Sequence, residues 1–197
     1  MKNVLRENVL NVAKSLFLEK GFDAVGMRDI AQALGLQPTQ VYRLELSKAD
    51  ILAELIIELN QQQIDSIPML LSAVVDTNAN ALERTVAYLH MLYCYDVQML
   101  PIRSVGAAYG WVWSAKYEST IVEQVRKLLA PIVSWMNDDG LDNVDGRAFA
   151  IWSVYYVGFR RAVIHGAGAD ECIESIRPSL EVLLRPQTCV AAKTHQI

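Results

Sequence analysis

The segment GMRDIAQALGLQPTQVYRLELSK, residues 26–48, contains two short helical patterns separated by a glycine. Gly35 permits the left-handed backbone of a tight turn, and Pro38 fits the first turn of the second helix, where no N–H donor is needed. Two short helices joined in this way predict a helix-turn-helix, a motif whose second helix enters the DNA major groove. The apolar residues of the first helix recur at the spacing of one buried face: Met27, Ile30, Ala31 and Leu34.

Helical patterns continue on both sides of this segment. Gly21 ends the preceding helix and Gly26 is an acceptable cap for the next. Ser47 is a natural N-cap for a long helix that we expect from Lys48 to about residue 67, where Pro68 predicts an end or a kink. The helix before Gly21 has an apolar stripe made of Leu5, Val9, Val12, Leu16 and Phe17.

The remaining residues predict only helices. Strand patterns are nearly absent, and residues 102–116, with two glycines, indicate a short or broken helix. The other helices are expected near 79–99, 118–137, 147–165 and 170–184. We therefore predict an all-α protein of about nine helices, with a helix-turn-helix domain at 1–47, a ligand-binding and dimerisation domain at 48–186 and a flexible tail at 187–197.

Composition narrows the class of protein. The chain has 197 residues, of which 52% are hydrophobic and 20% charged, so it can form a packed core. No apolar run reaches the roughly 18 residues of a membrane helix, and the amphipathic N-terminus has no signal region. Cys94, Cys172 and Cys189 form no disulfide framework. We expect reduced thiols, a cytoplasmic location and no contact with a membrane.

Charge is unevenly distributed. Residues 1–50 have seven Lys and Arg against six Asp and Glu, a net charge of +1, whereas the rest has eleven against sixteen, a net charge of −5. An acidic body argues against a general nucleic-acid coat, which would be basic throughout. It remains compatible with a DNA-binding protein that makes its contacts through one small surface.

The first 55 residues resemble the tetracycline-repressor (TetR) family of bacterial transcriptional regulators. The matching pieces, in order, are Ala13, Phe17, Lys20-Gly21-Phe22, Arg28-Asp29-Ile30-Ala31, Leu34-Gly35-Leu36, Val41-Tyr42 and Ser47-Lys48. The family's aromatic pair after the tyrosine is replaced by Leu44-Glu45, and Leu44 or Leu46 is expected to take the aromatic anchor's place. The resemblance implies a homodimer that regulates transcription, most often as a repressor.

The second helix of the motif has an unusually polar surface, because Val41 alone is clearly apolar. Gln40 is suited to an adenine edge and Arg43 to guanine or phosphate. Lys48, at a helix N-terminus, and Tyr42, by family resemblance, are expected to contact phosphates. The residues predicted to bind double-stranded operator DNA are Arg28, Gln37, Thr39, Gln40, Tyr42, Arg43 and Lys48.

The helix-turn-helix domain, which we call the head, has a net charge of only +1 over residues 1–50. One copy should therefore bind DNA poorly, so the function requires a dimer. The eighth helix has a stripe of small residues and the ninth a stripe of larger apolar ones. We predict that these two helices pair with their copies in a four-helix bundle; the alternative is that both faces pack within one subunit. The predicted interface residues are Gly158, Ala162, Gly166, Cys172, Ile176, Leu180 and Leu183.

Aromatic and methionine residues are concentrated in the middle of the chain, as in pockets of helical bundles. For any single residue, ordinary core packing is the simpler interpretation. As a group they predict a mostly apolar pocket for a small effector, which is a flat aromatic, a fatty or acyl compound, or a lipophilic cation. The predicted lining is Tyr88, Met91, Tyr95, Met99, Trp111, Trp113, Tyr117, Trp152, Tyr155 and Tyr156.

Other functional classes find little support. His90 and Cys94 share a helix face, but a metal site needs three or four ligands and no third is indicated. The acidic segment 137–146 lacks the EF-hand pattern. No nucleophile elbow, phosphate loop or dinucleotide motif is present. We therefore predict no enzyme, cofactor or metal; the alternative function is a helical small-molecule-binding or adaptor protein that has lost DNA binding.

Overall fold

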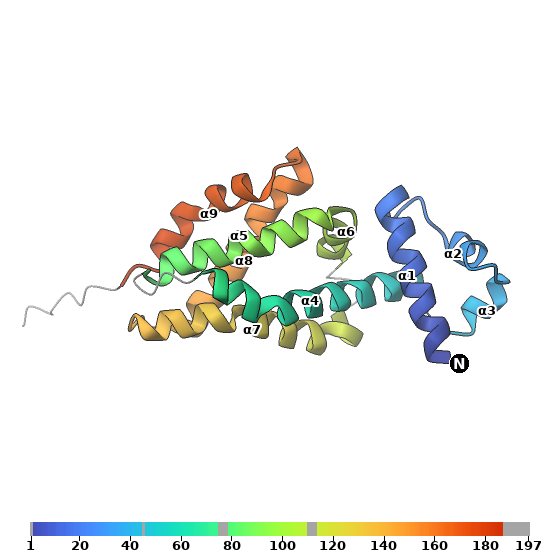
Figure 1. The fold of residues 1–197 in the computed structure, drawn as a ribbon, viewed down its shortest axis with the longest axis horizontal. Coiled ribbons are helices and arrows are strands. Elements are labelled where there is room, and N and C mark those ends of the chain that lie inside the picture. Colours follow the sequence, from blue (N-terminus) through green and yellow to red (C-terminus); the bar gives the residue numbers. More distant parts are fainter. Residues whose placement is uncertain (1, 45, 75–78, 110–113, 187–197) are drawn as a thin grey trace, which may run out of the picture.

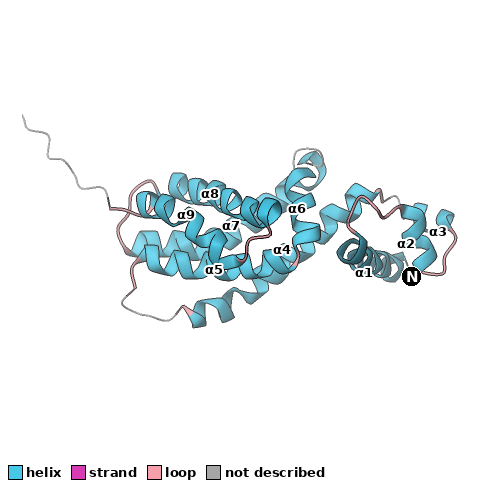
Figure 2. Ribbon diagram, turned by 90° about the horizontal axis from the view of Figure 1, so that it is seen from above, coloured by secondary structure: helices cyan, strands magenta, loops and turns pink. Residues whose placement is uncertain are grey.

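The computed structural model describes residues 2–44, 46–74, 79–109 and 114–186, and in these ranges the chain forms helices and no strand (Figures 1 and 2). The all-α prediction is confirmed. The helices are α1 Lys2–Lys20, α2 Met27–Ala33, α3 Pro38–Tyr42, α4 Lys48–Ala73, α5 Ala81–Gln98, α6 Leu100–Tyr109, α7 Ser114–Asp138, α8 Val144–His165 and α9 Ala169–Leu183.

The turns predicted in the first 50 residues have the expected local geometry. Gly21 and Gly35 have positive φ angles of 82° and 67°, which glycine adopts without a Cβ penalty. Asp50 N–H donates to Ser47 Oγ at 3.0 Å, and Ser47 N–H donates to Asp50 Oδ2 at 3.0 Å. This reciprocal capping box fixes the start of α4.

Two helix boundaries differ from the prediction. Helix α4 continues past Pro68 to Ala73, and Leu70 beyond the proline is buried in the body core. Burial of Leu70 is the physical reason that the helix persists, since tertiary packing outweighs a local breaker. The segment 102–116, predicted as a short or broken helix, contains the end of the short helix α6 and the start of α7, and residues 110–113 lie outside the described part of the chain. The predicted tail at 187–197 lies outside the described residues.

The side chains form two apolar cores that meet along α4. The head core contains residues of α1, α2 and α3, the first half of α4, and Ile102 and Tyr117 from the body. The body core is built from α5, α7, α8 and α9 with Leu70 of α4. Figure 1 shows α4 running from the head into the body. The domain boundary at residues 47 and 48 stays a prediction, and apolar packing is continuous across it.

The small-residue stripe of α8 packs inside the subunit. Gly158, Ala162, Cys172, Ile176 and Leu180 are all buried in the body core of a single chain. A Cβ at Gly158 would collide with Tyr93 Oη and lie 3.0 Å from the Cys172 carbonyl oxygen. These five residues therefore cannot line an interface with another subunit in this conformation, which corrects that part of the prediction. Gly166 and Leu183 retain some exposure.

The close packing at Gly158 generates a stability prediction. Gly158→Ala should lower the free energy of unfolding by roughly 1–3 kcal/mol, because the added methyl group overpacks the contact between α8 and α9. Urea denaturation followed by circular dichroism measures the change. Gly168→Ala is the control for a glycine with free space around it, since a Cβ there meets nothing within 4 Å; it should cost less than Gly158→Ala, at most about 1 kcal/mol for alanine at the N-cap of α9. Equal stability of the two variants would contradict this account of the packing.

Candidate functional site

The helix-turn-helix exposes most of the residues predicted to contact DNA. Arg28 on α2, and Gln37, Thr39, Gln40 and Arg43 in or beside α3, are exposed, whereas Lys48 is partly buried. The Tyr42 side chain lies outside the described part of the structure. Arg28 and Arg43 form no ion pair within the described residues. The exposed surface of α2 and α3 thus offers polar and cationic groups to a partner.

Two of these side chains already have contacts within the head. Gln40 Oε1 accepts a hydrogen bond from Gln37 N–H at 2.9 Å, which caps the start of α3. The Gln40 amide nitrogen remains available as a donor. Lys48 Nζ lies 4.1 Å from the centroid of the Phe22 ring, a cation–π contact that holds the ammonium group beside the start of α4.

Apolar anchors hold α3 against the rest of the head. Val41 is 1% exposed, and both Leu44 and Leu46 are buried in the head core. Sequence analysis expected either Leu44 or Leu46 to replace the aromatic anchor of the family, and in the structure both leucines are buried. The short helix α3 gains its stability from this burial, since five residues are too few for an independent helix.

Polar contacts connect the head to the body along α4. Arg6 of α1 binds Glu54 through two guanidinium nitrogens, and Lys14 Nζ lies 3.0 Å from Glu58 Oε1. At the first turn of α4, Asp50 Oδ1 accepts hydrogen bonds from Lys116 Nζ and Tyr117 Oη of α7 at 2.8 and 2.7 Å.

The Asp50 carboxylate is stabilised in its charged form by these donors. Burial raises the pKa of Asp50, but hydrogen bonds from Lys116, Ser47 and Tyr117 outweigh burial and hold that pKa well below its ordinary value. The same bond to Asp50 raises the pKa of Lys116. The body thus touches the helix start next to the DNA-binding motif through a charged cluster.

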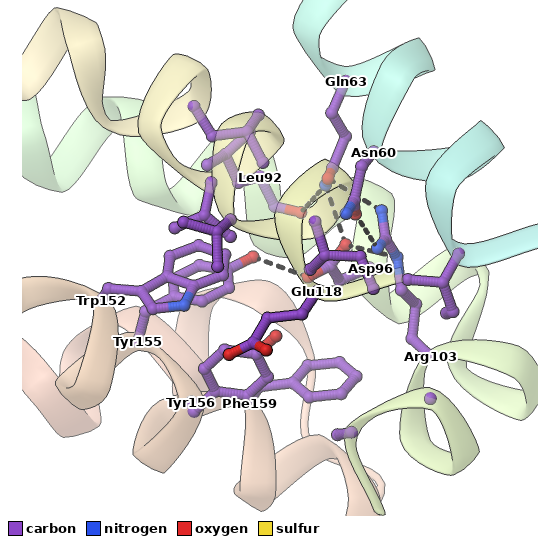
Figure 3. Close-up of a pocket in the computed structure, with 17 residues that line it drawn as sticks. Asn60, Gln63, Leu92, Asp96, Arg103, Glu118, Trp152, Tyr155, Tyr156 and Phe159 are labelled. Atoms are coloured by element: carbon purple, nitrogen blue, oxygen red, sulfur yellow. Dashed lines mark hydrogen bonds and ion pairs between the residues drawn. The ribbon is translucent and has the colours of Figure 1, made fainter. Parts of the chain in front are cut away.

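A pocket of about 880 Å³ lies in the body among α4, α5, α6, α7 and α8. Figure 3 shows Asn60, Gln63 and Asp96 gathered around Arg103, while the aromatic residues Trp152, Tyr155, Tyr156 and Phe159 lie on another side of the pocket. Its volume suits a drug-sized molecule. The lining consists of Ile56, Asn60, Gln63, Leu92, Asp96, Arg103, Gly106, Ala107, Glu118, Ile121, Val122, Val125, Leu128, Trp152, Tyr155, Tyr156 and Phe159.

Arg103 is the centre of the polar part of the lining. Its Nε lies 3.0 Å from Asp96 Oδ1, and its other two nitrogens donate to the side-chain oxygens of Asn60 and Gln63. Asp96 also accepts hydrogen bonds from Gln63 Nε2 and Tyr155 Oη, each at 2.8 Å. Burial and then Asp96 raise the pKa of Tyr155 well above its ordinary value, so this hydroxyl stays protonated as a donor.

Two aromatic rings of the lining, Trp152 and Tyr155, are stacked in parallel, and Tyr93 stacks on Tyr155 from behind the lining. The ring centroids of Tyr93 and Tyr155 lie 4.3 Å apart and those of Trp152 and Tyr155 5.5 Å apart, with an interplanar angle of 6° in both pairs. Tyr156 packs edge-on against Trp152. A Tyr93 Oη hydrogen bond to the Tyr155 carbonyl oxygen fixes the buried end of the stack. The pocket therefore presents a rigid aromatic surface.

Three of the predicted pocket residues line it: Trp152, Tyr155 and Tyr156. Tyr88, Met91 and Tyr95 pack in or against the body core, and Met99 and Tyr117 belong with the head core. These five residues are not part of the lining of this pocket, so the prediction is corrected for them; the hydroxyl groups of Tyr88 and Tyr117 bond to Leu128 and Asp50 instead. Trp111 and Trp113 lie outside the described residues.

Sequence analysis missed the polar residues of the lining. Asn60 and Gln63 continue the apolar stripe of α4 that includes Ile56 and Leu59, so their buried position was readable from helical spacing. Asp96 and Arg103 lie on different helices, and nothing in their local patterns links one to the other. Their pairing depends on the packing of α5 against α6.

Among the described residues, no three His, Cys, Asp or Glu side chains are grouped as metal ligands. His90 Nε2 instead lies 2.7 Å from Asp170 Oδ1 of α9. Within the same ranges, every helix is too short or too polar to cross a membrane.

Comparison with known proteins identifies the helix-turn-helix. Residues 9–55 match the family model of the bacterial regulatory proteins of the TetR family. Residues 9–55 are thus similar to the amino-terminal domain of the TetR family. This match confirms the resemblance noted in the sequence and covers most of α1, all of α2 and α3, and the start of α4. No curated protein sequence matches the chain.

Solved structures show that the TetR-type architecture extends over the body. A protein from Mesorhizobium loti MAFF303099, assigned to the TetR family of transcriptional regulators, is 16% identical with a TM-score of 0.65, and the alignment covers 93% of this chain and 96% of that one. The TetR-family regulator PfmR from Thermus thermophilus is 20% identical, with a TM-score of 0.57 and coverage of 93% and 97%.

A third similar structure is a bacterial regulatory protein in the TetR family from Rhodococcus RHA1, 19% identical, with a TM-score of 0.58 and coverage of 91% and 94%. At these identities the likeness establishes the fold alone. Together with the family match, it gives the chain the fold of a TetR-family transcriptional regulator, with a helix-turn-helix at the amino-terminal end.

The Asp50 cluster, where the TetR-type head meets α7, predicts a pH-dependent contribution to stability. Tyr117→Phe should lower the free energy of unfolding at pH 7 by about 1–2 kcal/mol, because a hydrogen bond to a charged acceptor is lost. The pKa of Asp50 is depressed in the folded protein, so its stabilisation is present above about pH 4 and lost as pH falls below that value. The cost of Tyr117→Phe should therefore hold at mildly acidic pH and shrink only as pH falls well below 4, toward the depressed pKa of Asp50.

Urea denaturation at neutral and acidic pH measures both effects. Tyr88→Phe is the matched control, because Tyr88 is buried and its hydroxyl donates to the Leu128 carbonyl oxygen, which does not titrate. A Tyr117→Phe cost that changes with pH no more than the Tyr88→Phe cost would rule out the charged acceptor.

Proposed function

We propose that the protein is a dimeric, ligand-responsive repressor that binds a palindromic operator and is released from it by a small effector. The observation that supports this most is a TetR-type helix-turn-helix joined through one helix, α4, to a body with a pocket of about 880 Å³. A pocket of this size has no role in DNA binding itself. It suits a protein that converts ligand binding into a change in DNA affinity.

In this proposal α3 is the recognition helix. Thr39 and the free amide nitrogen of Gln40 contact base edges, while Gln37 and Arg43 contact bases or phosphates at the ends of α3. Arg28, Tyr42 and Lys48 contact phosphates and set the register of the head on the duplex. The exposure of these side chains, where described, supports the assignment.

The dimer in this proposal forms through the exposed side of α8 and α9. Phe149, Tyr156 and Val163 recur every seven residues on α8, as do Val157 and Ile164. All five are large, apolar and between 45% and 73% exposed in a single subunit. A stripe with this spacing on one helix fits a second helix packed alongside it, and an apolar patch of this kind marks a protein interface. Gly166 and Leu183 lie on the same two helices.

Release of DNA would follow from the way the pocket adjoins α4 and α6. Asn60 and Gln63 of α4 line the pocket, and the same helix begins beside the DNA-binding motif. On α6, Arg103 lines the pocket while its neighbour Ile102 is fully buried in the head core. A ligand shifts the balance between head positions only by its differential affinity for them.

DNA binding is tested by fluorescence anisotropy with DNA upstream of the protein's own gene, over a series of salt concentrations. Arg28→Ala should weaken binding to all sequences and reduce the slope of log K against log salt by about two per dimer, one phosphate contact for each head. Lys127→Ala, which removes one exposed cation from α7, is the matched control and should change neither quantity. An unchanged salt slope for Arg28→Ala would remove this residue from the interface.

The dimer surface is tested by light scattering. The wild-type chain should have twice the subunit mass of 22.0 kDa at micromolar concentration, and Val157→Asp should shift it to the monomer because a buried, unpaired carboxylate is costly. Val157 is 65% exposed in the subunit, so the variant should fold. Met69→Asp, at a 61% exposed position on α4, is the control and should stay dimeric. A monomeric wild-type protein would contradict the proposal.

A further inference from the structure

The charges in the pocket lining are the starting point for the chemical class of the ligand. Among the described lining residues three are charged: Asp96, Arg103 and Glu118. Asp96 and Arg103 form an ion pair, and the side chain of each is only 11% exposed. The remaining charge is the carboxylate of Glu118, so the lining has a net charge of −1.

The charge of Arg103 is already balanced by a buried acid. Its Nε lies 3.0 Å from Asp96 Oδ1, and its other two nitrogens each donate a hydrogen bond, to Asn60 and to Gln63. A carboxylate or phosphate group bound at Arg103 would lie beside the Asp96 carboxylate and be repelled by it. The described lining offers no second cation.

The charge of Glu118, unlike that of Arg103, is not balanced by a described neighbour. This glutamate lies on α7, is exposed at the edge of the pocket, and forms no hydrogen bond or ion pair with a described residue. Figure 3 shows its carboxylate on the side of the pocket where Trp152, Tyr156 and Phe159 lie, away from the cluster around Arg103. The ring faces of Trp and Tyr attract cations through their negative quadrupoles. The carboxylate of Glu118 and the aromatic rings therefore both favour a positively charged ligand.

We infer that the pocket binds a lipophilic organic cation, whose positive charge lies at Glu118 and whose apolar body lies against the rings of α8. This inference rests on the proposed function, because it assigns a ligand class to the effector pocket. The fatty or acyl anion, and the flat aromatic without charge, are the alternatives that the experiment separates.

Two probes of nearly the same shape and opposite charge test the inference directly. Tetraphenylphosphonium and tetraphenylborate are titrated into the DNA-free, full-length protein, and binding is followed by calorimetry and by tryptophan fluorescence. Tetraphenylphosphonium should bind about tenfold more tightly or better. Its affinity should fall as salt is raised, because the charge of Glu118 is partly screened.

Glu118→Gln keeps the size of the side chain and removes its charge. The variant should bind tetraphenylphosphonium about threefold to fivefold more weakly, lose most of the salt dependence and bind tetraphenylborate no more weakly than before. Glu123→Gln is the matched control: it removes one exposed carboxylate from α7 outside the pocket lining, where Glu123 faces Arg126 and Lys127. It should leave both affinities unchanged.

The outcomes separate this inference from the proposed function. Equal affinities for the two ions, a preference for the borate, or equal effects of Glu118→Gln and Glu123→Gln would overturn the cation assignment, whatever the protein does to DNA. Adding saturating tetraphenylphosphonium to the anisotropy assay tests the proposed function separately. Cation binding with no change in DNA affinity would support the pocket assignment and contradict release by this ligand.

Discussion

The arrangement of the body depends on one buried ion pair, between Arg103 of α6 and Asp96 of α5. The amide groups of Asn60 and Gln63 on α4 and the hydroxyl of Tyr155 on α8 form hydrogen bonds with the pair, so four helices meet at one charged centre. An unpaired charge at this depth would cost roughly 3–5 kcal/mol, which penalises any packing in which one of the partners is displaced. The pair thus specifies how the helices around the pocket sit together.

The same pair also determines the chemistry of the pocket. Because Asp96 neutralises Arg103, the electrostatic character of the lining is set by Glu118 at the edge and by the aromatic stack on α8. The coupling between pocket and head has a physical path through this centre. Arg103 follows Ile102, which is buried in the head core, and Asn60 and Gln63 lie on the helix that starts at the DNA-binding motif. A ligand that displaces any of these side chains acts on both cores.

The head was predictable from sequence because its constraints are local. Gly35 must adopt positive φ, Pro38 must lie in a first turn and Ser47 must cap, and each of these requirements falls within a few residues of chain. The pocket was not predictable in the same way. An aromatic-rich segment looks the same whether its rings face a cavity or a core, and Tyr88 and Met91 proved to pack in or against the core. Tyr155 lines the pocket and Tyr88 does not, and this difference depends only on how each helix is rotated in the assembled bundle.

Gly158 belongs to a stripe of small residues that correctly indicated close helix packing but was assigned to the wrong partner, a second subunit. Small residues spaced at one face of a helix do indicate close helix packing, and α8 is packed closely, but against α9 and Tyr93 of the same subunit. The opposite face of α8 holds Phe149 and Val157, which no segment of the described chain covers. An exposed apolar patch of this kind marks a protein interaction site. The small residues of α8 thus pack within the subunit, and its large residues at seven-residue spacing form the surface that we propose a second copy of the chain covers.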